Sequence, residues 1–176
     1  MGADEFFAAR LEGRSLPDLR LPAATGGAVS LRKAGATVLF AYVYPRTGVP
    51  GRPLPAGWDQ IPGARGCTAE NFAFRDLEDD LSAEGATVMG LSAQPLDEQR
   101  EFEARERIPY LLLNDAGLAL ERTLGLLTFA VDGMTLYRRL TLIVVAGRIA
   151  KILHGELAPE LHPVAALDCL RRQETT

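Results

Sequence analysis

Hydrophobic residues fall in short runs separated by glycine, proline and charged residues, a pattern typical of buried strands that alternate with helices. Three runs rich in β-branched and aliphatic residues predict strands, at residues 36–44, 86–93 and 110–115. Apolar positions three and four apart, or a start at proline, predict helices between and after them, at residues 67–81, 95–107 and 116–124. The alternation predicts parallel βαβ units.

The two ends of the chain have a different pattern. Residues 15–21 and 28–31 flank a turn at residues 25–27 and predict two short strands, while residues 140–145 and 148–153 flank Ala146-Gly147 and predict an antiparallel hairpin. A closing helix is expected over residues 162–172, with Val164, Leu167 and Leu170 facing inward. Residues 2–12 fit either a short helix or a frayed arm. We therefore expect one α/β domain over residues 1–176, with a mixed central sheet and helices on both faces.

The amino-acid composition limits the kinds of partner that the protein is expected to bind. The 176 residues are 47% hydrophobic and 24% charged, with a net charge of −4, which argues against a nucleic acid or an anionic membrane as the main partner and leaves small diffusible substrates open. No apolar run approaches the roughly 18 residues of a membrane span, and the N-terminal stretch carries acids early, without an apolar signal segment. We expect a cytoplasmic protein.

The candidate chemistry lies at Cys67. The strand over residues 36–44 ends at Pro45, and Cys67 follows Gly66 at the start of the next helical pattern. Free N–H groups and the positive end of a helix dipole favour the thiolate, which is the nucleophilic form. The other cysteine, Cys169, is distant in sequence, so both are expected to be thiols. A zinc site made with His154 and His162 is disfavoured because no short-spaced ligand pairs exist, and no metal is expected.

Several segments together resemble a known family. In order, these are SLPDLRLP, VLFAYVYP, GCTAENFAFRD, VMGLSA, IPYLLLNDAGLALERTLGL and RRLTLIV. They are similar to peroxiredoxins of the alkyl hydroperoxide reductase and thiol-specific antioxidant family, particularly the Q type, also called bacterioferritin comigratory protein. The most specific segment is GCTAENFAFRD. The resemblance implies a thioredoxin-like fold and an enzyme that reduces peroxide through a sulfenic acid at Cys67, without a metal or bound cofactor.

The same resemblance assigns roles to neighbouring residues. It implies that Arg139 comes beside Cys67, where a permanently charged guanidinium holds the thiolate and polarises the peroxide. It also implies that Glu70 orients this arginine and that Pro45 belongs to the active-site loop. Thr141 either supports Arg139 or simply alternates within its strand.

The sequence departs from the family pattern in the loop before Cys67. The family's proline and threonine, seven and three residues before the cysteine, fall here on Gln60 and Ala64. We interpret residues 52–65 as an insertion, with Pro45 in the family position and Thr47 as the candidate for the displaced hydroxyl. The inserted Trp58 and prolines are expected to shape or cover the pocket.

The second departure concerns recycling. Many Q-type enzymes have a resolving cysteine five residues after the reactive one, where this chain has Phe72. Cys169 is either a buried structural cysteine, which we favour, or a resolving cysteine. We expect one-cysteine turnover with a peroxide substrate and an external thiol reductant, such as a thioredoxin-like protein, in a monomer or weak homodimer. A thiol–disulfide oxidoreductase, which would lack the usual Cys-x-x-Cys pair, and a non-catalytic interaction protein remain alternatives.

Overall fold

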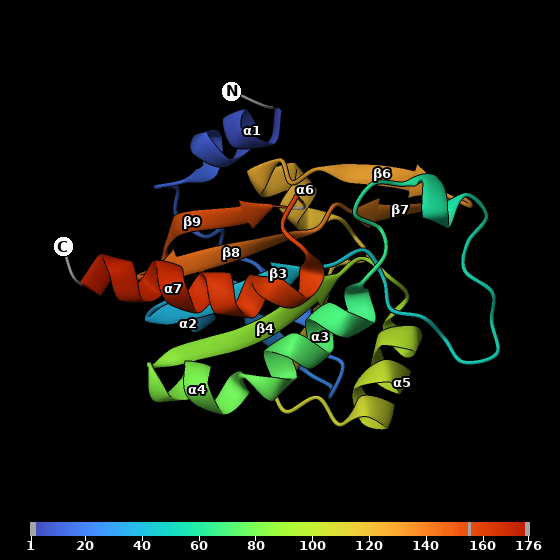
Figure 1. The fold of residues 1–176 in the computed structure, drawn as a ribbon, viewed down its shortest axis with the longest axis horizontal. Helices are drawn as coiled ribbons and strands as arrows, with labels where there is room; N and C mark the ends of the chain where they lie inside the picture. Colours follow the sequence, from blue (N-terminus) through green and yellow to red (C-terminus); the bar gives the residue numbers. More distant parts are fainter. Residues whose placement is uncertain (1–2, 155, 175–176) are drawn as a thin grey trace.

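A mixed five-stranded sheet forms the centre of the molecule (Figure 1). The computed structural model describes residues 3–154 and 156–174. The strand order is β5 (Leu111–Asn114), β4 (Ala86–Ser92), β3 (Val38–Val43), β8 (Leu140–Val145), β9 (Arg148–His154). Strands β3, β4 and β5 are parallel, whereas β8 and β9 run antiparallel to them. The predicted mixed sheet is confirmed.

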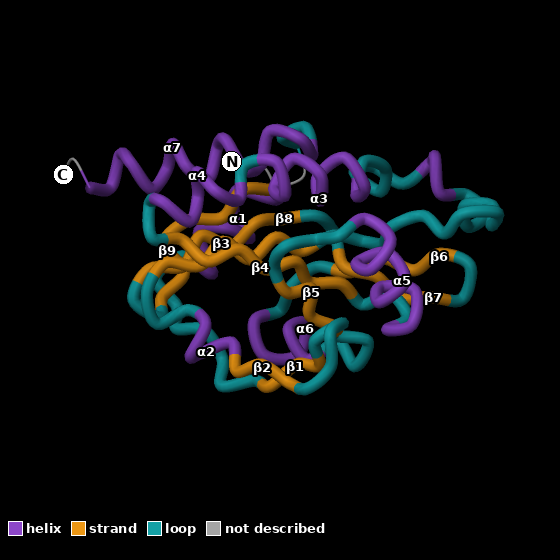
Figure 2. The backbone as a smooth tube through the Cα atoms, turned by 90° about the horizontal axis from the view of Figure 1, so that it is seen from below, coloured by secondary structure: helices purple, strands orange, loops and turns teal. Residues whose placement is uncertain are grey.

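Helices cover both faces of this sheet (Figure 2). One face carries α3 (Cys67–Asp76), α4 (Glu78–Ala83) and α7 (His162–Glu174). The other carries α2 (Leu31–Ala34), α6 (Ala119–Leu124) and the hairpin of β1 (Arg20–Pro22) and β2 (Ala28–Ser30). Two more helices, α1 (Ala3–Leu11) and α5 (Leu96–Glu106), contact β9 and β5 respectively.

Strand β3 supplies both layers of the core because its side chains alternate between the faces of the sheet. Leu39 and Ala41 join one buried cluster, and Phe40 and Tyr42 join the other, which also contains Cys67. The uniformly apolar sequence of β3 is explained by its central position, where both faces are covered.

A long connection runs from the end of β3 to Cys67. It contains the one-turn 3-10 helix η1 (Trp58–Gln60), and we call residues 46–66 the strap. Buried Trp58 packs against Phe129, with ring centroids 6.1 Å apart. Phe129 belongs to a hairpin of β6 (Thr128–Val131) and β7 (Met134–Tyr137), which the sequence analysis did not predict. The inserted loop is therefore packed against the body of the protein.

Two expectations about the helices were wrong. The helix predicted over residues 67–81 breaks at Leu77, whose backbone (φ −103°, ψ 4°) leaves the helical region, and α4 starts afresh with three acids that suit a helix N-terminus. Val164, expected to face inward, is 46% exposed. At the N-terminus, where a helix and a frayed arm were both open, the structure has helix α1, while residue 2 lies outside the described residues.

None of the helices in the described part of the chain combines the length and apolar character needed to cross a membrane.

Candidate active site

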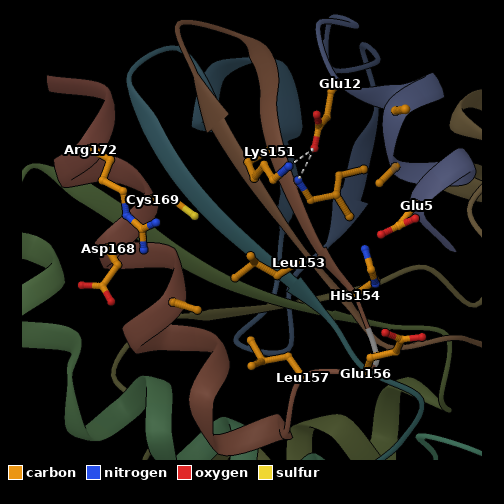
Figure 3. A pocket seen from close by; sticks show the side chains of 14 residues that line it. Glu5, Glu12, Lys151, Leu153, His154, Glu156, Leu157, Asp168, Cys169 and Arg172 are labelled. Carbon is orange, nitrogen blue, oxygen red and sulfur yellow. Dashed lines mark hydrogen bonds and ion pairs between the residues drawn. The ribbon is translucent and has the colours of Figure 1, made fainter. Parts of the chain in front are cut away.

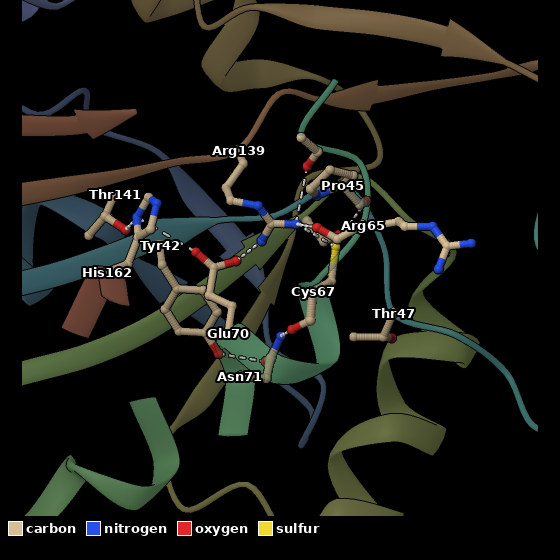
Figure 4. A network of polar contacts seen from close by, with 12 residues as sticks. Tyr42, Pro45, Thr47, Arg65, Cys67, Glu70, Asn71, Arg139, Thr141 and His162 are labelled. Atoms are coloured by element: carbon tan, nitrogen blue, oxygen red, sulfur yellow. Dashed lines mark hydrogen bonds and ion pairs between the residues drawn. The ribbon is translucent and has the colours of Figure 1, made fainter. Parts of the chain in front are cut away.

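Cys67 is the first residue of α3 and lies at the end of the strap (Figure 4). The chain enters this helix through Gly66, whose φ of 97° lies in the left-handed region. A Cβ at this position would come within 2.6 Å of the Pro159 side chain, so glycine is required for both its conformation and its small size. The Cys67 side chain is buried, with 3% of its surface exposed.

Arg139, the residue directly before β8, reaches Cys67. Its Nη2 lies 3.2 Å from the Cys67 Sγ and also donates to the carbonyl oxygens of Arg65, at 2.9 Å, and Gly63, at 3.3 Å. Strand β8 pairs with β3 so that Leu140 lies opposite Val43, which places Arg139 beside the end of β3. The juxtaposition implied by the resemblance is therefore present, and the final residues of the strap help to fix the guanidinium.

Burial has the largest effect on the ionisation of Cys67. It raises the pKa of the thiol above its ordinary value, and the Arg139 guanidinium is the main influence that lowers it. The Cys67 thiol also lies 3.5 Å from the Ala64 carbonyl, to which it can donate. The expectation that a helix start would leave this pKa low was therefore wrong for the buried thiol, and the ionised form depends on the charge of Arg139.

Glu70 lies one helical turn after Cys67 and is completely buried. Arg139 Nη1 donates to Glu70 Oε2, so one guanidinium contacts both the carboxylate and the sulfur. Burial raises the pKa of Glu70 to about 8, while Arg139 opposes the rise. Two acidic groups thus compete for a single permanent cation.

Asn71 holds the first turn of α3 in place. Its Nδ2 donates to the Cys67 carbonyl at 2.8 Å, and its Oδ1 accepts from the Tyr42 hydroxyl at 2.6 Å. Neither residue was predicted to belong to the site, because Tyr42 lies in a continuous apolar strand pattern and Asn71 belongs to no motif.

Pro45 connects the end of β3 to the strap, and Thr47 lies at the start of the strap. The Pro45 carbonyl accepts from the Ser92 hydroxyl at 2.9 Å. Thr47 is 1% exposed, and the Gln94 amide both accepts from its backbone N–H, at 3.0 Å, and donates to its hydroxyl, at 3.2 Å. The Thr47 hydroxyl therefore accepts a hydrogen bond from Gln94 in the structure. The expected contact between this hydroxyl and peroxide stays a prediction.

Behind Glu70 lie two buried residues, Thr141 and His162. The Thr141 hydroxyl is 2.8 Å from the His162 Nδ1, which is 3.8 Å from the Glu70 Oε1. Burial lowers the pKa of His162 to about 4, and the charge of Arg139 contributes. From sequence, His162 was a candidate only for a disfavoured metal site. In the described residues, no group of three or more His, Cys, Asp or Glu is arranged to hold a metal ion.

Cys169 lies in a groove of about 550 Å³ lined by α1, β9 and α7 (Figure 3). It is half-buried, in contrast to the buried structural cysteine that we favoured, because its side of α7 borders this groove. Both cysteines are free thiols in the structure.

Comparison with known proteins identifies relatives over most of the chain. The redoxin family model matches residues 11–167. The chain is 28% identical over 159 residues to the chloroplastic peroxiredoxin Q of Arabidopsis thaliana, and 27% identical over 151 residues to that of Oryza sativa subsp. japonica. These matches cover 89% and 86% of this chain, but they span only 65% and 62% of the length of the plant proteins.

Solved structures show the same fold. Peroxidoxin BcpB from Mycobacterium tuberculosis superposes with a TM-score of 0.75 at 24% identity, covering 92% of this chain and 96% of that protein. The bacterioferritin comigratory protein of Xanthomonas campestris superposes with a TM-score of 0.70 at 22% identity, covering 89% and 92% respectively. The fold is thioredoxin-like, as in peroxiredoxins.

Proposed function

The chain belongs to the redoxin family, and from this membership we propose that it is a thiol-dependent peroxidase of the peroxiredoxin Q type. It reduces hydrogen peroxide and small organic hydroperoxides through a sulfenic acid at Cys67. The plant relatives are peroxiredoxins Q, and the structural work on the Xanthomonas campestris protein concerns alkyl peroxide reduction.

One observation carries this proposal, namely that the Arg139 guanidinium contacts the Cys67 sulfur while fixed by Glu70 and two strap carbonyls. The Cys67 thiolate attacks the terminal oxygen of the peroxide, and the O–O bond breaks. The sulfur becomes a sulfenic acid, and the departing hydroxide or alkoxide takes a proton to become water or an alcohol. Arg139 stabilises the negative charge first on the sulfur and then on the leaving oxygen.

The other predicted residues complete the site. Glu70 holds the Arg139 guanidinium in place. Pro45 and Thr47, at the junction of β3 and the strap, form the side of the pocket that orients the peroxide. The buried positions of Glu70 and Thr47 support these roles, because a buried carboxyl or hydroxyl group is not simply a solvated surface group.

Turnover uses one cysteine of the enzyme and an external thiol. A thiol condenses with the sulfenic acid to give a mixed disulfide and water, and a second thiol then releases Cys67 as the thiol. Phe72, rather than cysteine, at the position five residues after Cys67 supports this route. The reductant is a thioredoxin-like protein or another thiol, and the enzyme acts in the cytoplasm as a monomer or weak homodimer.

Chemical trapping tests the proposal. The protein is treated with hydrogen peroxide in the presence of dimedone, which labels sulfenic acids, and the label is mapped by mass spectrometry. We expect label on Cys67 and none in Cys67→Ser. Absence of label at every peroxide dose, in folded protein, would favour the non-catalytic alternative. Reduction of insulin disulfides would instead favour a thiol–disulfide oxidoreductase.

A further inference from the structure

The buried polar groups around Cys67 do not all have partners. Glu70 Oε2 accepts from Arg139, but Oε1 has no hydrogen-bond partner although it is fully buried. The polar atom that faces it is the Nδ1 of His162, at 3.8 Å, and this histidine is itself 0% exposed. Burying a carboxylate oxygen without a hydrogen-bond donor costs free energy of folding. The position of Glu70 Oε1 opposite the titratable His162 ring therefore needs an explanation.

Charge balance supplies the explanation. Among the described residues, Arg139 is the permanent cation that contacts both acids of the site, Cys67 and Glu70. If both acids ionise, a dry site carries one uncompensated negative charge, which is unfavourable. The site stays neutral when Cys67 ionises only if a proton is held elsewhere within it.

We propose that the Glu70–His162 pair holds this proton, shared between Glu70 Oε1 and His162 Nδ1, whenever Cys67 is ionised. The pair retains this proton when the Cys67 sulfur gives its own proton to water, because burial raises the pKa of Glu70 to about 8. The ionised site is then neutral. Once the sulfur is oxidised and uncharged, the pair releases its proton to water. This proton replaces the proton that the leaving oxygen took from water. His162 is thus a positioning residue that acts on Cys67 through Glu70 and Arg139.

The surroundings of the pair suit this role. A modest approach of the two side chains would convert the 3.8 Å separation into a hydrogen bond and give Oε1 its missing partner. Thr141 lies 2.8 Å from His162 Nδ1, and its hydroxyl can either donate to the ring or accept from it. The hydroxyl donates to Nδ1 while this atom is unprotonated, and when Nδ1 carries the proton, Thr141 Oγ1 and Glu70 Oε1 are both acceptors for its single N–H.

Other charged groups near the pair act in known directions. Arg139 and His154, on β9, both oppose a positive charge on His162. These influences and burial keep the ring neutral until a negative charge forms on the sulfur. Tyr42, on β3, interacts with Glu70, and its phenol stays protonated because burial raises its pKa well above the ordinary value.

The test measures ionisation of Cys67 and does not require peroxide. In a Cys169→Ser background, Cys67 is the sole thiol, and its alkylation by iodoacetamide is followed against pH. His162→Gln keeps a group that can bond Thr141 but cannot take the proton. We expect about tenfold slower alkylation at pH 7, corresponding to a Cys67 pKa about one unit higher, with rates converging at high pH. Thr141→Ser should match the parent, whereas Thr141→Val should lie between the two.

NMR gives an independent readout because the chain has only two histidines. The ring signal assigned by loss in His162→Gln should move toward its protonated position as the thiolate forms, and this movement should be absent in Cys67→Ala. Identical pH–rate profiles for the parent and His162→Gln, a uniform slowing at every pH, or a His162 signal unaffected by Cys67 would each overturn the inference. It rests on the proposed function only in requiring that Cys67 ionise, so it can fail while peroxidase activity stands.

Discussion

The Nη2 of Arg139 lies 3.2 Å from the Sγ of Cys67, although the two residues are 72 positions apart in sequence. The contact exists because β8, which follows Arg139, pairs with β3, whose end leads into the strap. Burial raises the pKa of Cys67, and the Arg139 guanidinium is the main influence that lowers it, so this contact favours the nucleophilic thiolate.

The first prediction concerns the strap. Trp58→Ala should remove the packing on Phe129 and destabilise the fold by about 3 kcal/mol, a typical cost for a buried tryptophan. It should also make Cys67 react faster with a bulky thiol reagent, since we expect the inserted part of the strap to cover the pocket. Urea denaturation and reaction with Ellman's reagent measure the two effects. Trp58→Phe, which keeps an aromatic ring, should show smaller changes, and unchanged access to Cys67 in Trp58→Ala would contradict a covering role.

Thr47 provides the second prediction. Thr47→Val should slow the reaction of Cys67 with hydrogen peroxide by roughly tenfold or more, a typical loss for a positioned polar group in a buried site. The change also removes the hydroxyl to which the Gln94 Nε2 donates, so stability should fall by about 1 kcal/mol. Thr47→Ser preserves the hydroxyl and serves as the control. A normal peroxide rate in Thr47→Val would remove Thr47 from the site.

The third prediction is a pH dependence of stability. Burial raises the pKa of Glu70 from 4.5 to about 8, so between these values the unfolded chain loses a proton that the folded protein keeps. The protein should therefore lose stability as pH rises from about 4.5 to 8, by about 1 kcal/mol for each pH unit. The free energy of unfolding, compared with that of Glu70→Gln at several pH values, measures this contribution. A difference between the two proteins that does not vary with pH would contradict the shifted pKa.

Cys169 is the subject of the fourth prediction. If turnover uses only Cys67, Cys169→Ser should leave the catalytic rate with a small thiol reductant unchanged. Peroxide-treated parent protein, mapped by mass spectrometry without reduction, should contain no Cys67–Cys169 disulfide within or between chains. Detection of that disulfide, together with loss of turnover in Cys169→Ser, would assign a resolving role to Cys169.

Much of the fold followed from the sequence because its central strands are buried on both faces and appear as continuous apolar runs. The run that became β3 is an example. The hairpin of β8 and β9 followed instead from the tight turn between its two runs, because β9 is an edge strand with exposed residues. The break at Leu77 and the exposure of Val164 did not follow, because both depend on where a helix lies against the sheet rather than on its own periodicity.

The site was only partly predictable. Cys67 was predicted from its place at the start of a helix, whereas the roles of Glu70 and Arg139 came from resemblance, and the structure brings these three together. His162 could not be found in this way, because its approach to Glu70 depends on how α7 crosses the sheet. The raised pKa of Cys67 was also missed, since the sequence indicates the start of a helix but not how deeply that start is buried.

The most direct test of the central claim is the rate of sulfenic acid formation at Cys67, measured against pH in single-turnover reactions with hydrogen peroxide. Arg138→Gln removes the same charge from an exposed neighbour and serves as the matched control for Arg139→Gln. We predict that Arg139→Gln slows the reaction at pH 7 by about a hundredfold or more and shifts the Cys67 pKa upward, while Arg138→Gln behaves like the parent. An Arg139→Gln protein that is folded and reacts with peroxide at the parent's rate would contradict the account.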